Sequence, residues 1–297
     1  MRWIVGLDFR SRSAGALRFA RWLYQNTQHN RFYAVHALEL PPYANLVPDE
    51  LAGQALAQLN QTLEREQADS SFTDVGVVVD ERADRGLAKA IEEHTGDGVI
   101  IGRRAPADSA SLIALGRIAR RVIREIAQPT IVVPPDQDLD RVAAGPILLA
   151  TDLAETSLPA LRFAGSLANE LGRELIIVHT VRVHGSLEGV ISGTVWSSAQ
   201  LEHRQHAEAQ LSAWAQKHGA GAAQLRVVEG PISPELLAVA NEERASLIVC
   251  GSRRLSLAER IFSSSVGTEL AAAAPIPVAI IPHDHVEAAA EGIPAFA

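Results

Sequence analysis

The chain has 297 residues, a formal net charge of −8, 47% hydrophobic and 21% charged residues, and one cysteine, Cys250. This length favours two domains, the acidic balance argues against general nucleic-acid binding, and a single cysteine excludes an internal disulfide and favours a reducing compartment. No apolar run approaches the roughly 18 residues of a membrane span, and the first one is too short for a signal peptide, so we expect a cytoplasmic protein without membrane contact.

In chain order, the first half alternates short apolar runs with helical patterns. Apolar runs predict strands at residues 3–7, 31–38, 74–79, 98–101 and 130–133. Apolar positions at helical spacing predict helices at residues 13–24, 48–68, 84–94 and 116–126. Strands that alternate with helices pair in parallel through right-handed crossovers. The first half therefore predicts an α/β fold with a five-stranded, doubly wound parallel sheet.

The second half follows the same order. Strands are predicted at residues 146–150, 174–181, 224–228, 246–250 and 278–281, and helices at residues 160–171, 197–218, 234–243 and 266–273. The sequence thus predicts two tandem sheets of the same kind.

An internal repeat supports this division. The run from Ala16 to Ala20 recurs from Ala160 to Ala164, and the order of matches is kept along both halves. Residues 134–138 are polar and proline-rich, which is typical of a boundary. We expect domains at residues 1–137 and 145–283, followed by a C-terminal tail at residues 284–297.

The first candidate site residues stand at strand ends. Asp8 and Asp152 follow the first strand of each half, and Gly102 and Gly251 end the fourth. In doubly wound sheets, ligands bind beyond the carboxyl ends of the strands, at the point where the strand order reverses. These positions therefore predict a ligand site in each half.

Both halves resemble the universal stress protein family over nearly their whole length. The similarity is carried by the strand-end Asp, by the later glycine-ended strand, and by the stretches at residues 151–157, 247–253 and 274–278. The resemblance implies a strand order of 3-2-1-4-5 in an adenine nucleotide alpha hydrolase-like fold. It also implies pairing through the fifth strand, which a tandem chain can make internally as a pseudo-dimer; a further homodimer stays open.

In ATP-binding members of the family, the Asp after the first strand contacts the adenine end. A Gly-x2-Gly-x9-Gly-(Ser/Thr) loop after the fourth strand holds ribose and phosphates. The chemistry is that of backbone N–H groups at a helix N-terminus, which glycine allows to approach an anion closely. ATP, with Mg²⁺ only as its companion, is therefore the cofactor that the resemblance implies.

The second-half loop keeps the family spacing but only its first glycine. Arg254 and Ser264 stand at the other two glycine positions, and Ser265 keeps the hydroxyl. The ligand residues predicted for this half are Asp152, Thr180, Gly251, Ser252, Arg253, Arg254, Ser264, Ser265 and Val266.

The first-half loop keeps the first and third glycines, Gly102 and Gly116, with one residue more between the second and third glycine positions. Ala105 replaces the second glycine, and Arg117 replaces the Ser or Thr. The ligand residues predicted for this half are Asp8, Gly102, Gly116 and Arg117.

Two interpretations of these loops compete. Either they are surface turns that have lost the ligand, and the strand-end Asp caps a turn, or arginines replace amide donors and bind phosphate as bidentate forks.

Other candidate groups are weaker. Four arginines at helical spacing (Arg117, Arg120, Arg121, Arg124) predict either an anion-binding surface or a solvated helix face. His203 with His206 and His283 with His285 lack a clear third metal ligand. Cys250 is expected to be a small buried hydrophobic residue. No Gly-x-Gly-x-x-Gly follows a first strand, and no Walker A motif occurs.

The function that this sequence predicts is regulation of the stress response by binding. The first hypothesis is weak adenine-nucleotide binding, better in the second half because its loop spacing and hydroxyl remain. The alternative is a nucleotide-independent scaffold for protein partners. A slow ATPase or autophosphorylation ranks last, since no paired general acid and base is visible.

Overall fold

The computed structural model describes residues 1–9, 13–41, 47–103, 115–136, 142, 144–181, 193–252 and 265–285. The strands of the first half are β1 (Arg2–Gly6), β2 (Arg31–Glu39), β3 (Asp74–Asp80), β4 (Gly98–Gly102) and β5 (Thr130–Val133). Its helices are α1 (Ala14–Asn26), α2 (Pro48–Arg65), α3 (Ala83–Glu93) and α4 (Arg117–Glu125).

The second half repeats this order. Its strands are β6 (Ile147–Thr151), β7 (Leu175–Val181), β8 (Gln224–Glu229), β9 (Leu247–Ser252) and β10 (Val278–Pro282). Its helices are α6 (Leu158–Leu171), α7 (Gly193–Lys217), α8 (Ile232–Glu242) and α9 (Val266–Ala273). The predicted elements are confirmed to within a few residues; α7 begins four residues earlier than its pattern predicted.

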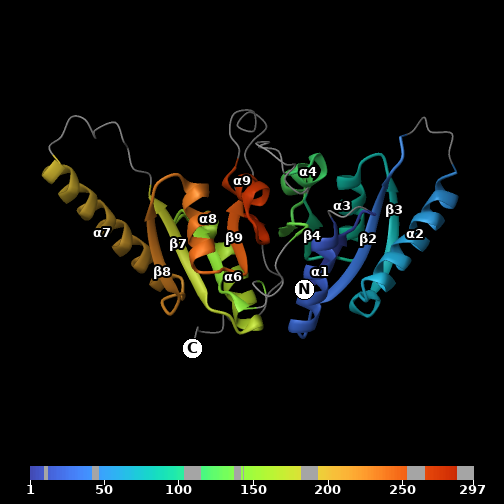
Figure 1. Ribbon diagram of the computed structural model, residues 1–297, viewed down its shortest axis with the longest axis horizontal. Coiled ribbons are helices and arrows are strands. Elements are labelled where there is room, and N and C mark those ends of the chain that lie inside the picture. The colour runs from blue at the N-terminus through green and yellow to red at the C-terminus, as the bar shows by residue number, and fades with distance from the viewer. Residues whose placement is uncertain are drawn as a thin grey trace.

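All ten strands form one sheet in the order β3-β2-β1-β4-β5-β10-β9-β6-β7-β8. Each half has the expected 3-2-1-4-5 order, and its strands are parallel. The two five-stranded sheets that the sequence predicted join at the centre, where β5 and β10 pair antiparallel with Ile131 opposite Ala279, as the family resemblance implied. This pairing satisfies backbone groups that two open edges would leave exposed. The two halves consequently lie side by side, with α2 and α7 at the far ends (Figure 1).

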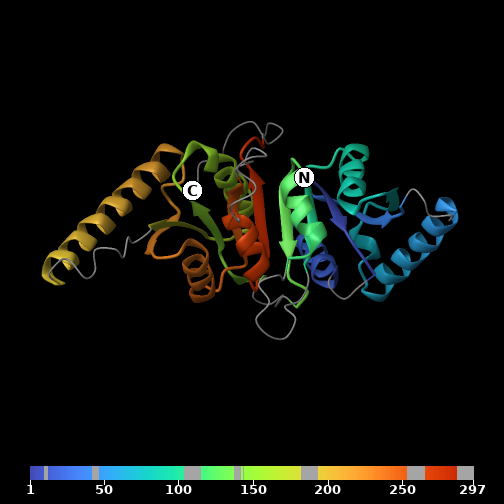
Figure 2. The ribbon, with the colours of Figure 1, turned by 90° about the horizontal axis from the view of Figure 1, so that it is seen from above.

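Successive side chains along each strand point to opposite faces of the sheet, and each apolar face packs against a layer of helices. Trp3 and Val5 belong to a core cluster with residues of α1, α2, α6 and α7. Ile4 belongs to a cluster with residues of α3, α4, α8 and α9. Both clusters include residues of β5 and β10, so both cores continue across the seam between the halves. Figure 2 shows from above how the two halves adjoin at this seam.

Three side-chain contacts also cross this seam. The rings of Trp3 and Phe163 meet edge to face, with centroids 6.2 Å apart. Asn30 Nδ2 donates to Glu170 Oε1 at 3.0 Å, and Arg103 Nη2 donates to the Ala274 carbonyl at 2.7 Å. Hydrogen bonds and packing thus join the halves on both sides of the central strand pair.

The C-terminal end is described as far as His285. The His283 backbone N–H donates to the Ser252 carbonyl at 3.1 Å, so the chain after β10 remains attached to the sheet at this point. Residues 286–297 of the predicted tail lie outside the described residues. Among the helices of the described ranges, none is long and apolar enough to cross a membrane.

Candidate functional site

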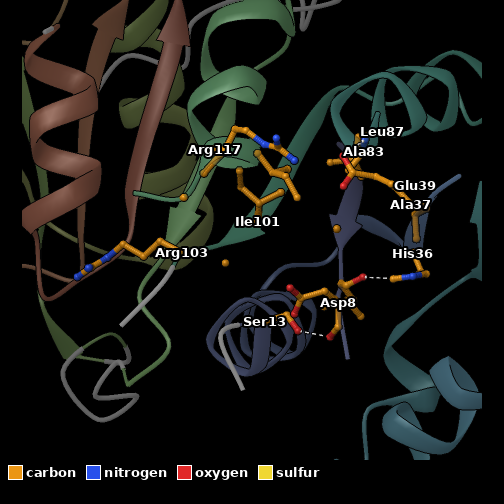
Figure 3. Close-up of a pocket in the computed structure, with 17 residues that line it drawn as sticks. Asp8, Ser13, His36, Ala37, Glu39, Ala83, Leu87, Ile101, Arg103 and Arg117 are labelled. Atoms are coloured by element: carbon orange, nitrogen blue, oxygen red, sulfur yellow. Dashed lines mark hydrogen bonds between the residues drawn. The ribbon is translucent and has the colours of Figure 1, made fainter. Parts of the chain in front are cut away.

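A cavity of about 360 Å³ opens at the carboxyl ends of β1, β2 and β4 (Figure 3). This volume falls within the roughly 300–1,000 Å³ of small-molecule sites. All four residues predicted for the first-half site line it: Asp8, Gly102, Gly116 and Arg117. The fold therefore brings together residues that lie more than a hundred positions apart in the chain.

One wall of the cavity is the N-terminus of α4. Gly116 is the N-cap residue, with φ −62° and ψ 162°, and it provides no side-chain cap. The next three residues, Arg117, Ile118 and Ala119, line the cavity as well. The first N–H groups of a helix have no intrahelical acceptor, and the helix dipole is positive at this end. This wall, with the exposed Arg117 guanidinium, is suited to an anion.

The opposite wall is formed by the ends of β1 and β2. Ser13 Oγ donates to the Asp8 carbonyl, and His36 Nδ1 lies 2.9 Å from the Leu7 carbonyl. Because a carbonyl only accepts, Nδ1 carries the proton and Nε2 of a neutral His36 is an acceptor. The Phe9 ring packs on His36 with centroids 4.2 Å apart. These contacts, drawn in part in Figure 3, hold polar groups at the carboxyl ends of β1 and β2, on the cavity wall.

The second half repeats this histidine. His179 Nδ1 lies 2.9 Å from the Thr151 carbonyl, as His36 does from Leu7. The sequence analysis did not single out either residue. Their separation is one position less than that of Ala16 and Ala160. A search for repeated polar residues near the ends of the second strand of each half, with such a drift allowed, would have found them.

Two of the residues predicted for the second half, Asp152 and Ser265, make hydrogen bonds within their own half. Asp152 Oδ1 accepts from Ser157 Oγ at 2.7 Å and from the Ala154 N–H at 3.1 Å, so the carboxylate caps a turn. Ser265 Oγ accepts from the Thr268 N–H at 3.2 Å as the N-cap of α9.

The remaining second-half residues are placed as follows. Gly251 and Ser252 end β9 and Val266 begins α9. Thr180 is near the end of β7, and its hydroxyl is buried without a hydrogen bond in the described part of the chain. β6 pairs with β9 as Ala150 opposite Cys250, so Asp152 and Ser252 follow at the same sheet edge. Arg253, Arg254 and Ser264 lie outside the described residues.

Comparison with known proteins agrees with this geometry. The family model described as "Universal stress protein family" matches residues 1–134 and 144–282. The chain belongs to this family.

Two solved structures are similar to this universal stress protein over both halves. One is a universal stress protein from Archaeoglobus fulgidus DSM 4304, with 17% sequence identity, a TM-score of 0.65, and coverage of 95% of this chain and 98% of that one. The other is a functionally unknown protein from Pseudomonas aeruginosa PAO1, with 14% identity, a TM-score of 0.65, and coverage of 95% and 92%. At these identities the likeness shows the shared fold. No curated protein matches the chain.

The four-arginine face of α4 is partly committed to an internal ion pair. Arg121 Nη1 lies 3.6 Å from Oδ1 of Asp84, a carboxylate whose side chain is 1% exposed. Arg82 also pairs with Asp84 and bridges to Glu125. Burial acts to raise the pKa of Asp84, but the hydrogen bond from Arg82 and its charge outweigh this and hold the pKa below its ordinary range. In this universal stress protein, α4 is therefore tied to α3.

Metal and thiol chemistry find little support in the described ranges. No group of three His, Cys, Asp or Glu residues in the described part of the chain is placed to hold a metal. His203 and His206 are exposed on α7. Cys250 is 3% exposed, as expected for a buried residue, and burial raises the pKa of its thiol to about 12. At neutral pH this cysteine is therefore protonated and unsuited to be a nucleophile.

Proposed function

We propose that this universal stress protein is a stress-response regulator that binds an adenine nucleotide, ATP accompanied by Mg²⁺, and acts by binding. The observation that supports this best is the first-half cavity, where Asp8, Gly102, Gly116 and Arg117 converge on an uncapped helix N-terminus. Backbone N–H groups and an arginine fork together form a phosphate-binding wall.

The cavity walls suggest the orientation of the nucleotide. The phosphates would lie against Gly116 and Arg117 at the start of α4. The base would lie toward the ends of β1 and β2, where apolar walls such as Val35 and Leu87 accompany Asp8 and His36. Small-molecule sites commonly combine such apolar walls with a few polar groups that orient the ligand.

Binding is expected to be weak, and we place the stronger site in the first half. Ala105 and Arg117 replace a glycine and a hydroxyl of the family loop, which removes close backbone approach and one donor. The loop spacing favours the second half, but the Ser265 hydroxyl, which that loop would offer to a phosphate, already accepts from the Thr268 N–H of its own helix. A nucleotide in the second half would have to compete with this contact, whereas Gly116 lies on the wall of a cavity.

Native mass spectrometry tests the proposal on the wild type, Asp8→Ala and Asp152→Ala, before and after ATP and Mg²⁺ are added. We expect a bound nucleotide in the wild type and in Asp152→Ala, and reduced occupancy in Asp8→Ala. Loss in Asp152→Ala alone would move the stronger site to the second half. If no variant binds at millimolar ATP, the nucleotide function is rejected.

A second candidate function is a scaffold for protein partners. Figure 1 shows α7 extending beyond the sheet, and all six residues from Leu201 to His206 are exposed on it. Arg117→Ala and Leu201→Glu distinguish the two functions. The first should weaken ATP binding and spare partner capture; the second should do the reverse.

A further inference from the structure

Arg103 directly follows β4 and is held in the sheet by its backbone, whose N–H donates to the Val133 carbonyl at 3.0 Å. The residue borders the first-half cavity, but Figure 3 shows its side chain pointing away from Asp8 and His36, toward the second half. Only 4% of Arg103 is exposed. Burial lowers the pKa of its guanidinium, and the charge of Asp136 opposes this. Burying a cation costs free energy unless it is hydrogen-bonded, so this placement requires an acceptor for the guanidinium.

The acceptor of Arg103 is the end of a second-half helix. Arg103 Nη2 donates to the carbonyl of Ala274, the C-cap residue of α9. A cation is favourable at a helix C-terminus, where the helix dipole is negative. The other end of α9, at Ser265 and Val266, adjoins the phosphate loop predicted for the second half. A helix of eight residues, roughly 12 Å long, therefore connects the Arg103 contact to Ser265 and Val266.

The connection is asymmetric. Gly102 corresponds to Gly251, so Ser252 stands where the first half has Arg103. A serine side chain is too short to reach across the seam as Arg103 does, and the Ser252 carbonyl instead accepts from the His283 N–H within its own half. Among the described residues, this link runs from the first cleft to α9.

We propose that Arg103 is a positioning residue that couples ligand occupancy of the first-half cavity to α9 of the second half. The proposal rests on the nucleotide function proposed above. A ligand that contacts Gly102 at the end of β4 displaces or stiffens the strand end that carries Arg103, and α9 follows through its C-terminal carbonyl. Coupling of this kind is reciprocal, so a ligand that binds at the start of α9 changes the affinity of the first-half cavity.

Hydrogen exchange with ATP and Mg²⁺ tests this coupling in the full chain with Asp152→Ala, which weakens direct ligand contact at the site predicted for the second half. Added to this background are Arg103→Met, Arg103→Lys or Asn30→Ala. The Asn30 change is a matched control because it removes another hydrogen bond across the seam, that to Glu170. All four proteins are compared at ATP concentrations that give equal protection of α4, and thermal unfolding confirms that each is folded.

In the background protein and in Asn30→Ala, ATP should slow exchange of the α9 amides about fivefold, the lower range of typical allosteric coupling. This response should disappear in Arg103→Met and be partly kept in Arg103→Lys, which retains the charge and a donor. Persistence of the full response in Arg103→Met would overturn the proposal, as would protection of α4 without any response in α9. If ATP protects neither helix and native mass spectrometry finds no nucleotide, the nucleotide function itself is rejected, and the coupling with it.

Discussion

The two halves share their strand order but differ where their last helices begin. α4 follows Gly116, which offers no side-chain cap, and it faces the first-half cavity. α9 follows Ser265, whose hydroxyl accepts from the Thr268 N–H. One helix thus begins beside a cavity without a side-chain cap, whereas the other has an N–H group satisfied by its own cap. The comparison teaches that two copies of one domain can keep the same topology while equivalent helix ends differ in role. In one copy the helix start faces a cavity, and in the other a side chain of the same copy caps it.

The two halves also differ in the contact that links α4 to α3 and α9 to α8. In the first half, the buried Asp84 of α3 pairs with Arg121 of α4. In the second half, Ser233 Oγ donates to Glu269 Oε2 at 2.6 Å between α8 and α9. An ion pair therefore links α4 to α3, whereas a hydrogen bond from a hydroxyl to a carboxylate links α9 to α8.

The largest effect is expected from Asp84→Ala. The change removes the buried carboxylate that Arg82 and Arg121 share, and the free energy of unfolding should fall by about 3 kcal/mol, as when one partner of a buried pair is removed. Ser233→Ala, the matched change in the second half, should cost about 1 kcal/mol, as for an ordinary hydrogen bond. Urea unfolding followed by circular dichroism measures both. Equal losses would contradict the distinction between the two ties.

The same pair predicts a pH dependence. The pKa of Asp84 is lowered from 3.8 in the folded protein. Its stabilising contribution is therefore complete at neutral pH and is lost as the pH falls below about 4 and through the folded pKa. Asp84→Asn should therefore flatten the acid limb of the dependence of stability on pH, which urea unfolding at several pH values measures.

A smaller effect is expected from Arg117→Ala at the mouth of the first cleft. Loss of a charge-assisted hydrogen bond to phosphate should weaken ATP binding about tenfold, equivalent to about 1.4 kcal/mol. Arg124→Ala is the control, because Arg124 is exposed near the other end of the same helix. Titration calorimetry compares the two, and an equal effect of both changes would indicate only a general loss of positive charge.

Ser265→Ala should reduce stability rather than affinity. Replacing a serine N-cap with alanine costs about 1 kcal/mol, so the unfolding midpoint in urea should fall. ATP affinity should stay within twofold of the wild type. A marked loss of affinity at unchanged stability would show that the hydroxyl serves the ligand, as the loop spacing predicted.

The last prediction changes no residue and concerns the reactivity of Cys250, which is buried in β9 of the second half. With its thiol pKa raised to about 12, this residue should react with iodoacetamide at pH 8 more than a thousandfold more slowly than an exposed cysteine. Mass spectrometry follows the modification, and urea should restore the reactivity. Rapid modification of the folded protein would show that the strand end opens.

Sequence patterns predicted the strands and helices well because each strand is a short apolar run between helices of clear periodicity. Strand order and the pairing of β5 with β10 do not follow from such runs. Ile131 and Ala279 are buried strand residues like many others, and the family resemblance alone implied their pairing.

At the site, sequence patterns located the strand-end residues Asp8 and Gly102 but not their surroundings. Hydroxyls that cap a helix and hydroxyls that bind phosphate occupy the same sequence position, so the two roles of Ser265 could not be separated. Arg103 likewise stands in the expected loop, and only the three-dimensional structure shows that its side chain crosses the seam.

Photolabelling with 8-azido-ATP tests most directly whether the first half holds the stronger nucleotide site. The full chain is irradiated with the probe and Mg²⁺, digested, and its labelled peptides are identified by mass spectrometry, with excess ATP as competitor. We predict label that ATP displaces in peptides of residues 1–41 and 74–103, because these contain the cavity walls at which we place the base. Displaceable label confined to residues 144–285 would contradict this placement, and label that ATP does not displace would contradict nucleotide binding itself.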